Sequence, residues 1–259
     1  CYTRGHQSDY DHWAALGNKG WGFDDVLPVF KRSEHYEGGE GPFHGTGGKL
    51  NIADLRFTHP VSSAFIKAGV EAGHPATDDF NNDVQEGVGM YKVNQKDGER
   101  CGVSKAYLHP VMDRPNLTVL TSALVNRILF EGKRAIGVDV EHNGQIRTLK
   151  ADNEVILSGG AINSPQVLKL SGVGPAAELA EHNIPLVHEL PGVGENLQDH
   201  PDFIFGYTTG SPATFGLSPG GMWRALMAMG TYRKTRRGLW TSNFAEAGAF
   251  LKTQPDLSA

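Results

Sequence analysis

Cysteine is scarce in this sequence, where Cys1 and Cys101 are the only two among 259 residues. Two cysteines cannot build the disulfide framework of a small secreted domain, so a reducing compartment, the cytoplasm, is the expected location. No apolar run approaches the roughly 20 residues that a membrane-spanning helix needs. A formal net charge of −5 and a pI near 6.1 argue against a nucleic-acid partner, which would need a basic face.

Motifs of metal and hydrolytic chemistry are missing as well. The 11 histidines show no H-E-x-x-H or clustered ligand spacing, and no G-x-S-x-G elbow of a serine hydrolase occurs. The DFNND run at residues 79–83 imitates a calcium loop, but Val84 replaces the required glycine and no glutamate closes the loop. We therefore predict a solvated turn there and no metal site.

What the sequence does contain is an informative stretch at residues 153–175, NEVILSGGAINSPQVLKLSGVGP. The apolar run 155–157 has no polar alternation, which is typical of a strand buried on both faces. Ser158, Gly159 and Gly160 then break the strand, and glycines allow the backbone to approach a ligand closely. A tight turn alone is the alternative interpretation of these three residues.

A helix should follow this turn. Asn163 or Ser164 can cap it, and Pro165 suits its first position. The N-terminus of such a helix offers unpaired N–H groups and a partial positive charge to a pyrophosphate. The pattern therefore predicts a phosphate-binding turn.

A run of strand patterns precedes this turn, at residues 117–121, 123–130, 135–142 and 145–150. Asn143-Gly144 is the dipeptide most favoured in a two-residue hairpin, so three of these strands should form an antiparallel meander. A meander that leads into a buried strand, a glycine turn and a helix differs from the βαβ alternation of a nicotinamide dehydrogenase. It suits a flavoprotein better.

The rest of the chain is long enough for one large or two smaller domains. Helices are expected at residues 9–16, 24–32, 59–72, 105–111 and 219–236, strands at 88–94, 203–208 and 244–251, and a loop at 37–48. Asp24 is a plausible cap of the second helix.

Several long blocks together resemble the glucose-methanol-choline (GMC) oxidoreductase family of FAD-dependent alcohol oxidases and dehydrogenases. GGAINSPQVLKLSGVGP at residues 159–175 is similar to the second signature of the family, and PGVGENLQDHP at 191–201 to the segment after it. Residues 2–34 resemble the end of the first signature and the helices behind it, and residues 100–138 also follow the family pattern. The resemblance covers nearly the whole chain and is closest to the bacterial choline and aliphatic-alcohol dehydrogenases.

The resemblance implies a mixed α/β fold: a partial Rossmann-like FAD-binding domain with an antiparallel β-meander, and part of a substrate domain built on an antiparallel sheet. Residues 1–48 and 113–201 would belong to the FAD domain, and residues 49–112 and 202–259 mostly to the substrate domain. It also implies that this chain is an internal piece, which lacks the family's catalytic histidine region. We therefore expect no catalytic residue in it, and we expect the isolated piece to be inactive, prone to aggregation and weak in FAD binding.

The resemblance also assigns ligand contacts. The residues expected to contact FAD are Tyr2, Arg4, Val125, Ser158, Gly159 and Gly160. Those expected near the substrate pocket are Asn196, Asp199, His200 and Asp202. For the second set, side-chain hydrogen bonds that pin a loop are an equally good explanation, although Asp202 could also meet a cationic alcohol such as choline.

The function implied is hydride transfer from the CH–OH group of an alcohol, choline or an aliphatic or aromatic primary alcohol, to FAD, with oxygen or quinone as electron acceptor. A non-catalytic remnant that keeps the fold without flavin is the alternative, and a nicotinamide dehydrogenase is a third interpretation. Residues 222–240 join an apolar stretch to Arg233, Lys234, Arg236 and Arg237, which allows peripheral contact with an anionic membrane. Cations that complement the dipole of a helix ending before Gly238 are the simpler explanation.

Overall fold

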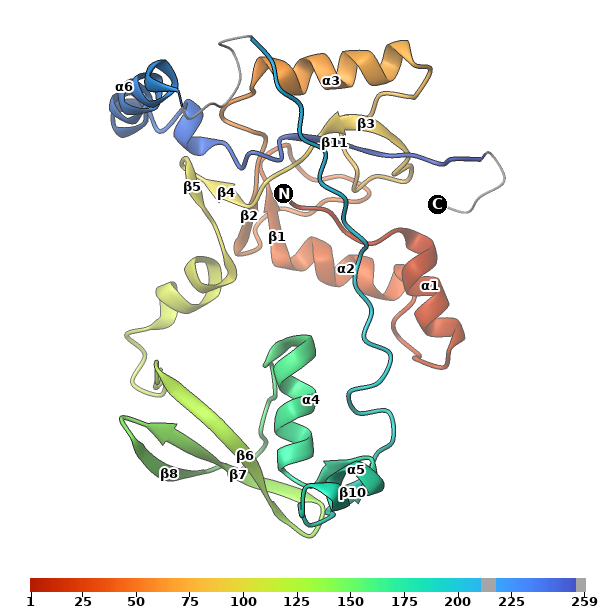
Figure 1. Ribbon diagram of the computed structural model, residues 1–259, viewed down its shortest axis with the longest axis vertical. Coiled ribbons are helices and arrows are strands. Elements are labelled where there is room, and N and C mark those ends of the chain that lie inside the picture. The colour runs from red at the N-terminus through yellow and green to blue at the C-terminus, as the bar shows by residue number, and fades with distance from the viewer. Residues whose placement is uncertain (211–217, 255–259) are drawn as a thin grey trace. The chain divides into compact units, whose positions relative to one another are not determined.

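The computed structural model describes residues 1–210 and 218–254, and the chain divides into two compact units. Unit 1 comprises residues 1–117 and 207–259, and unit 2 comprises residues 118–206 (Figure 1). The sequence-based assignment of four segments to an FAD and a substrate domain stays a prediction.

Unit 1 contains short strands among helices. Its elements are α1 (Gln7–Ala15), α2 (Phe23–Ser33), β1 (Glu34–Tyr36), β2 (Leu50–Ile52), α3 (Pro60–Glu71), β3 (Gly87–Met90), β4 (Gln95–Lys96), β5 (Glu99–Arg100), the π-helix η1 (Ser104–Leu108), the 3-10 helices η2 (His109–Val111) and η3 (Leu239–Thr241), α6 (Pro219–Thr235) and β11 (Ala247–Phe250). All five helices expected here are present within a few residues, although the expected helix at 105–111 is divided between η1 and η2.

Helix capping explains where α2 begins. Its N-cap is Gly22 rather than the predicted Asp24. Asp25 lies three residues after the cap, and its carboxylate accepts a hydrogen bond from the backbone N of Gly22 at 3.2 Å. The acid that binds the free N–H is therefore inside the first turn.

In unit 1, helix α3 packs against the antiparallel pair β3–β11 (Figure 1). The helix can approach the sheet because Gly69 faces Val88: a Cβ at position 69 would lie 2.8 Å from Val88 Cγ1. Ile52 and Phe80 are also fully or almost fully buried and form part of the core. Both strands expected here are shorter than predicted.

Unit 2 consists of a three-stranded meander and a short helical segment. Its elements are β6 (Ala123–Glu131), β7 (Arg134–His142), β8 (Gln145–Lys150), α4 (Gly160–Leu170), β9 (Val173–Gly174), α5 (Ala176–Glu181) and β10 (His188–Glu189). The antiparallel order β6-β7-β8 confirms the predicted meander. Asn143 and Gly144 have φ values of 54° and 72°, as the two-residue hairpin requires.

A buried serine joins α4 to the meander. Ser171, the C-cap of α4, accepts a hydrogen bond from the backbone N of Ile128 on β6 at 2.8 Å and donates one to the carbonyl of Val167. Ile128 on β6 and Val140 on the central strand β7 supply buried apolar side chains.

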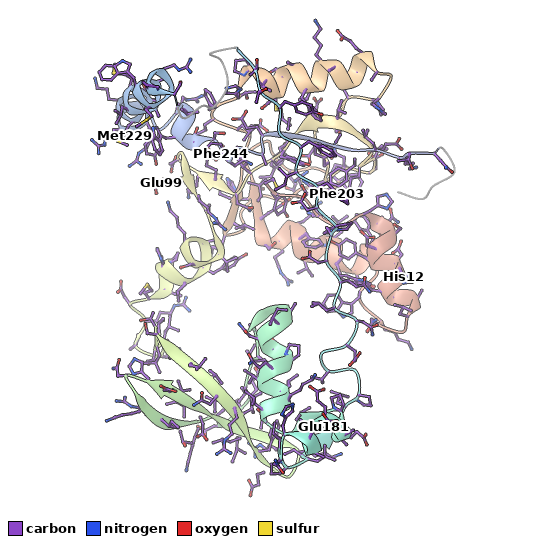
Figure 2. All side chains as sticks on the ribbon, viewed as in Figure 1. His12, Glu99, Glu181, Phe203, Met229 and Phe244 are labelled. Atoms are coloured by element: carbon purple, nitrogen blue, oxygen red, sulfur yellow. The ribbon has the colours of Figure 1, made fainter. Side chains whose placement is uncertain are left out.

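Three predicted strands, at residues 117–121, 155–157 and 203–208, are wrong, because none of them pairs with another strand within the described ranges. An extended segment becomes a strand only when a neighbour takes up its N–H and C=O groups. The prediction of a buried strand at 155–157 fails most clearly, since Ile156 is 78% exposed. Phe203 is also exposed (Figure 2).

Candidate functional site

The diglycine bend, Ser158, Gly159 and Gly160, leads directly into α4. Gly159 is the N-cap, and Gly160 has a φ of +85°, a left-handed conformation that glycine adopts without strain. The helix therefore starts earlier than predicted, and Pro165 lies inside it. Ser164 does not cap the helix as expected, but its Oγ accepts a hydrogen bond from the backbone N of Gly159 at 3.0 Å.

The bend is open to solvent. All three of its residues are exposed, and a Cβ added to Gly160 would meet no atom within 4 Å. The first N–H groups of a helix have no partner inside the helix, so those of α4 are available to an anion beside an unobstructed backbone. These features fit the pyrophosphate of a dinucleotide cofactor such as FAD.

An open cavity of about 1180 Å³ runs along α4 from the residue after the bend. Its lining includes Ala161, Ser164 and Pro165 from the helix and Gly194, Asn196 and Gln198 from the segment opposite. This volume exceeds the roughly 300–1,000 Å³ of typical small-molecule sites. Unit 2 therefore places a large cavity beside the diglycine bend.

The four predicted pocket residues do not lie together in this cavity. Asn196 lines it in a left-handed conformation with φ 54°, whereas Asp199, His200 and Asp202 are exposed on the extended segment that follows and are not among the lining residues. Asp199 Oδ1 accepts a hydrogen bond from the backbone N of His200 at 2.8 Å. Their part in substrate binding stays a prediction.

Val125 lies on β6, where it is half-buried opposite Val140. The register shifts between Val125 and Arg127, so this strand is irregular directly after the predicted cofactor contact. The position fits an ordinary core valine, and the predicted backbone contact to the adenine side of FAD stays a prediction.

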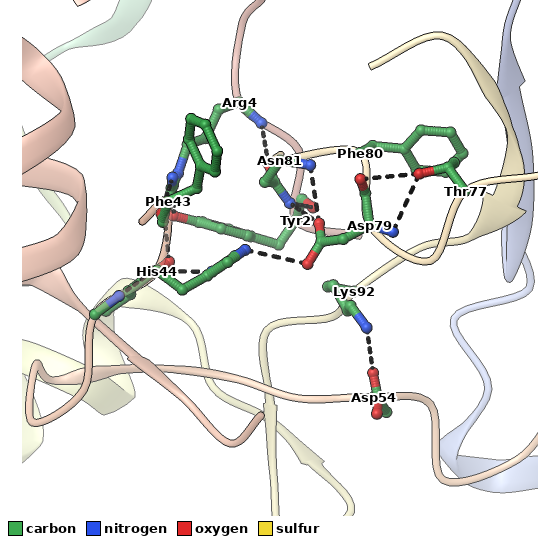
Figure 3. A network of polar contacts seen from close by, with 12 residues as sticks. Tyr2, Arg4, Phe43, His44, Asp54, Thr77, Asp79, Phe80, Asn81 and Lys92 are labelled. Atoms are coloured by element: carbon green, nitrogen blue, oxygen red, sulfur yellow. Dashed lines mark hydrogen bonds and ion pairs between the residues drawn. The ribbon is translucent and has the colours of Figure 1, made fainter. Parts of the chain in front are cut away.

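Tyr2 and Arg4, the remaining predicted cofactor residues, belong to a buried polar network of unit 1 (Figure 3). The guanidinium of Arg4 donates to Glu34 Oε2 at 2.7 Å, to the carbonyl of Phe43 at 2.6 Å and to the hydroxyl of Tyr2 at 3.1 Å. Burial raises the pKa of Tyr2 to about 12, against the opposing effect of Arg4. The charge of Arg4 is therefore already matched by an internal carboxylate.

His44 lies at the centre of this network, between two carboxylates. Its Nδ1 is 3.1 Å from Glu34 Oε1, and its Nε2 is 3.1 Å from Asp79 Oδ2 (Figure 3). The second contact is an ion pair without hydrogen-bond alignment, since Nε2 has no aligned partner among the residues described. Asp79 Oδ1 in turn accepts a hydrogen bond from the backbone N of Asn81 at 2.8 Å.

Charge and burial compete at these three side chains. Burial opposes the charged form of His44, but the carboxylates of Asp79 and Glu34 outweigh it and raise the pKa of the imidazole. Burial likewise opposes ionisation of both acids, and their contacts to His44, backbone N–H groups and, for Glu34, Arg4 lower the pKa of each carboxyl. The network is therefore a cluster of mutually stabilised charges.

Sequence reasoning missed this network. The run 79–83 was predicted to be a solvated turn, which is wrong for Asp79, Phe80 and Asn81, because all three are buried. The polar residue types of this run gave no indication that part of it is buried. The one available signal was Phe80, an aromatic residue inside the polar run. Over residues 1–210 and 218–254 no group of three or more His, Cys, Asp or Glu residues could hold a metal ion.

The bend, the meander and the cavity are the features expected of a flavin-binding fold, and the comparison with known families agrees. The GMC oxidoreductase family model matches residues 1–202. The chain belongs to the GMC oxidoreductase family. The predicted family, mixed α/β fold and FAD cofactor are thereby confirmed at the level of the family.

Similar proteins span a longer chain. The chain is 43% identical to the alcohol dehydrogenase [acceptor] of Pseudomonas putida over 98% of this chain and 47% of that protein. It is 41% identical to the oxygen-dependent choline dehydrogenase of Rhizobium johnstonii over 99% of this chain and 46% of the relative. An FAD-dependent oxidoreductase from Chaetomium thermophilum superposes with a TM-score of 0.79 at 29% identity, over 93% of this chain and 44% of that structure. The chain spans about half the length of the curated relatives it matches.

Proposed function

We propose that the chain forms the FAD-contacting part of an oxidoreductase that oxidises the CH–OH group of an alcohol. The observation that carries this proposal is the open diglycine bend at the start of α4, beside an antiparallel meander, in a chain of the GMC family. The names of the similar proteins, an alcohol dehydrogenase and a choline dehydrogenase, support an alcohol such as choline as substrate.

The chain's own residues would hold the cofactor. Ser158, Gly159 and Gly160 would receive the pyrophosphate at the free N–H groups of α4, and Val125 would contact the adenine side through its backbone. Tyr2 and Arg4, which lie in the part of the chain that resembles the first signature of the family, would help to shape the cofactor site. When bound, FAD supplies the acceptor for the hydride that leaves the carbinol carbon.

Asn196, Asp199, His200 and Asp202 would contribute one wall of the substrate pocket. An ionised Asp202 would attract a cationic alcohol such as choline. We assign no catalytic acid or base to the described residues: His44 is buried between Glu34 and Asp79, so its nitrogens are already engaged.

The electron acceptor would be oxygen or a quinone. A quinone resides in the membrane, and peripheral contact with a membrane would suit that acceptor. Within the part of the chain that the structure describes, no helix is both long and apolar enough to cross a bilayer.

The experiment is spectroscopic. The full-length gene product should purify yellow, and its flavin absorbance should bleach when choline or a primary alcohol is added without oxygen. A colourless protein that reduces NAD would support the nicotinamide dehydrogenase instead. A colourless, inactive protein would support the alternative of a non-catalytic remnant.

A further inference from the structure

Helix α6 presents apolar side chains to solvent. Met222, Trp223, Leu226 and Met227 are each at least 60% exposed. The last three follow Met222 by one, four and five residues, which places all four on one side of the helix. The opposite side of the helix is half-buried, at Gly221, Ala225, Ala228 and Tyr232.

The helix is fixed to unit 1 from its other side. The indole N–H of Trp240 donates to the carbonyl of Ala225 at 2.9 Å, and Arg236 Nη1 pairs with Glu99 Oε1 at 2.9 Å. The exposed apolar side chains therefore belong to a helix that is bonded to neighbouring segments of unit 1.

Cations extend the same face. Arg233 follows Leu226 by seven residues, and Lys234 follows Met227 by seven, which is two helical turns. Both are exposed, and in the described parts of the chain neither forms an ion pair. The exposed apolar side chains and the two cations thus form one surface, which we call the α6 face: Met222, Trp223, Leu226, Met227, Arg233 and Lys234.

The charged residues in the segment around this face are all positive. The chain as a whole carries a net charge of −5, yet residues 203–245 contain five Lys and Arg residues and no acid. Arg224 and Arg237 therefore add to the same local field, whereas the charge of Arg236 is matched by Glu99. A partner of this surface should be anionic.

We propose that the α6 face binds the surface of an anionic lipid membrane, with the helix lying in the interface. Apolar side chains would enter the boundary between headgroups and acyl chains, while the long Arg233 and Lys234 side chains reach the anionic headgroups. Trp223 suits this interface because its large apolar ring carries a polar N–H group. A second copy on the same face would bring cations of both copies together, so self-association is disfavoured. The proposal rests on the proposed function, because contact with the membrane would serve electron transfer to a membrane quinone.

Vesicle co-sedimentation of the full-length gene product tests the proposal. The protein should pellet with vesicles of equal parts phosphatidylcholine and phosphatidylglycerol, and at least about tenfold less with phosphatidylcholine alone, with binding that weakens as salt rises. The double variant R233E/K234E should lose about tenfold or more of this binding. The matched charge reversal K19E/K133E, at two exposed turn lysines, should leave it unchanged.

A second variant separates membrane insertion from charge alone. The Trp fluorescence of the protein should shift to the blue on anionic vesicles, and Trp223→Phe should remove most of that shift while the protein still binds. Binding of R233E/K234E equal to that of the parent would overturn the proposal. So would a dimer in the absence of lipid that Leu226→Ser dissociates, because the face would then serve self-association. Flavin content measured on the same samples reports on the proposed function separately.

Discussion

Glu246 holds the first turn of α3 from a position 187 residues further along the chain: its Oε2 accepts a hydrogen bond from the backbone N of His59, the N-cap residue, at 2.6 Å. The same oxygen accepts from Ser62 Oγ at 2.9 Å, and Oε1 accepts from Ser242 Oγ at 2.6 Å. The side chain is almost fully buried. A buried carboxylate at a helix N-terminus thus joins α3 to the segment before β11.

We predict that Glu246→Ala lowers the free energy of unfolding of unit 1 by about 3 kcal/mol, since it leaves buried donors without an acceptor. Urea unfolding followed by Trp fluorescence measures the change. Glu71→Ala makes the same substitution at an exposed acid paired with Lys67 at 3.7 Å, and it should change stability by less than about 0.5 kcal/mol. Equal effects of the two substitutions would show that Glu246 has no structural role.

Glu34 should be at least as sensitive. Its carboxylate pairs with Arg4 and His44 and also accepts a hydrogen bond from Gly45 N at 2.9 Å. Glu34→Gln removes the negative charge but keeps the shape, so Arg4 and His44 would remain buried with less compensation. We expect a loss of about 3 to 5 kcal/mol in urea unfolding. A loss below about 1 kcal/mol would contradict the interpretation of a charge-stabilised network.

The network also predicts a pH dependence. The pKa of His44 is raised above its ordinary value of 6.5, so the folded chain binds a proton that the unfolded chain releases. Its contribution is fully present below pH 6.5 and is lost as the pH rises through the folded pKa. Glu34 and Asp79 act oppositely: their lowered pKa values give stability above their ordinary values of 4.5 and 3.8, which is lost as the pH falls through the folded values.

Unfolding free energies measured from about pH 5.5 to about pH 8.5 test this sign. The parent protein should lose stability toward the alkaline end, and His44→Gln should flatten that part of the profile while lowering stability at the acidic end. His74→Gln, at a half-buried histidine on the turn after α3, is the control and should keep the slope. A parent profile that rises with pH across this range would be incompatible with a protonated His44.

The meander was predictable because its determinants are local. Asn143-Gly144 selects the hairpin conformation, and alternating residues of β6 and β7 set the register. The run 155–157 has an equally clear apolar pattern, but a strand also needs a partner, and its own residues cannot specify one. The start of α4 was misplaced for a related reason: Pro165 tolerates the first turn but does not require it.

The charged network could not be predicted from the sequence. Arg4, Glu34, His44 and Asp79 lie on four separate segments, and their burial depends on the packing that brings those segments together. Charged residues are usually exposed, so each one alone indicates a surface position. The diglycine bend was predictable because two glycines at the start of a helix have a direct consequence for the backbone conformation.

Ser171 should couple α4 to the meander within unit 2. Ser171→Ala removes the acceptor of the Ile128 N–H and the donor to Val167, at a cost of about 1 to 3 kcal/mol. Hydrogen exchange at the Ile128 amide measures this directly and should become faster. Ser164→Ala, which removes the acceptor of Gly159 N at the other end of the helix, should leave exchange at Ile128 unchanged. Unchanged protection at Ile128 in Ser171→Ala would exclude the coupling.

Gly160 offers the sharpest test of the bend, because Gly144 is a matched glycine elsewhere in unit 2. Their φ values are +85° and +72°, and an added Cβ meets no atom within 4 Å at either position. Alanine at each should therefore cost a similar strain, about 1 to 2 kcal/mol. Only Gly160→Ala should also lower the flavin content of the full-length gene product, because the new Cβ projects from the backbone that would receive the pyrophosphate. Flavin absorbance per protein, measured beside thermal melting, separates the two effects. If both variants lose flavin equally, or neither does, the bend is only a turn and the cofactor lies elsewhere.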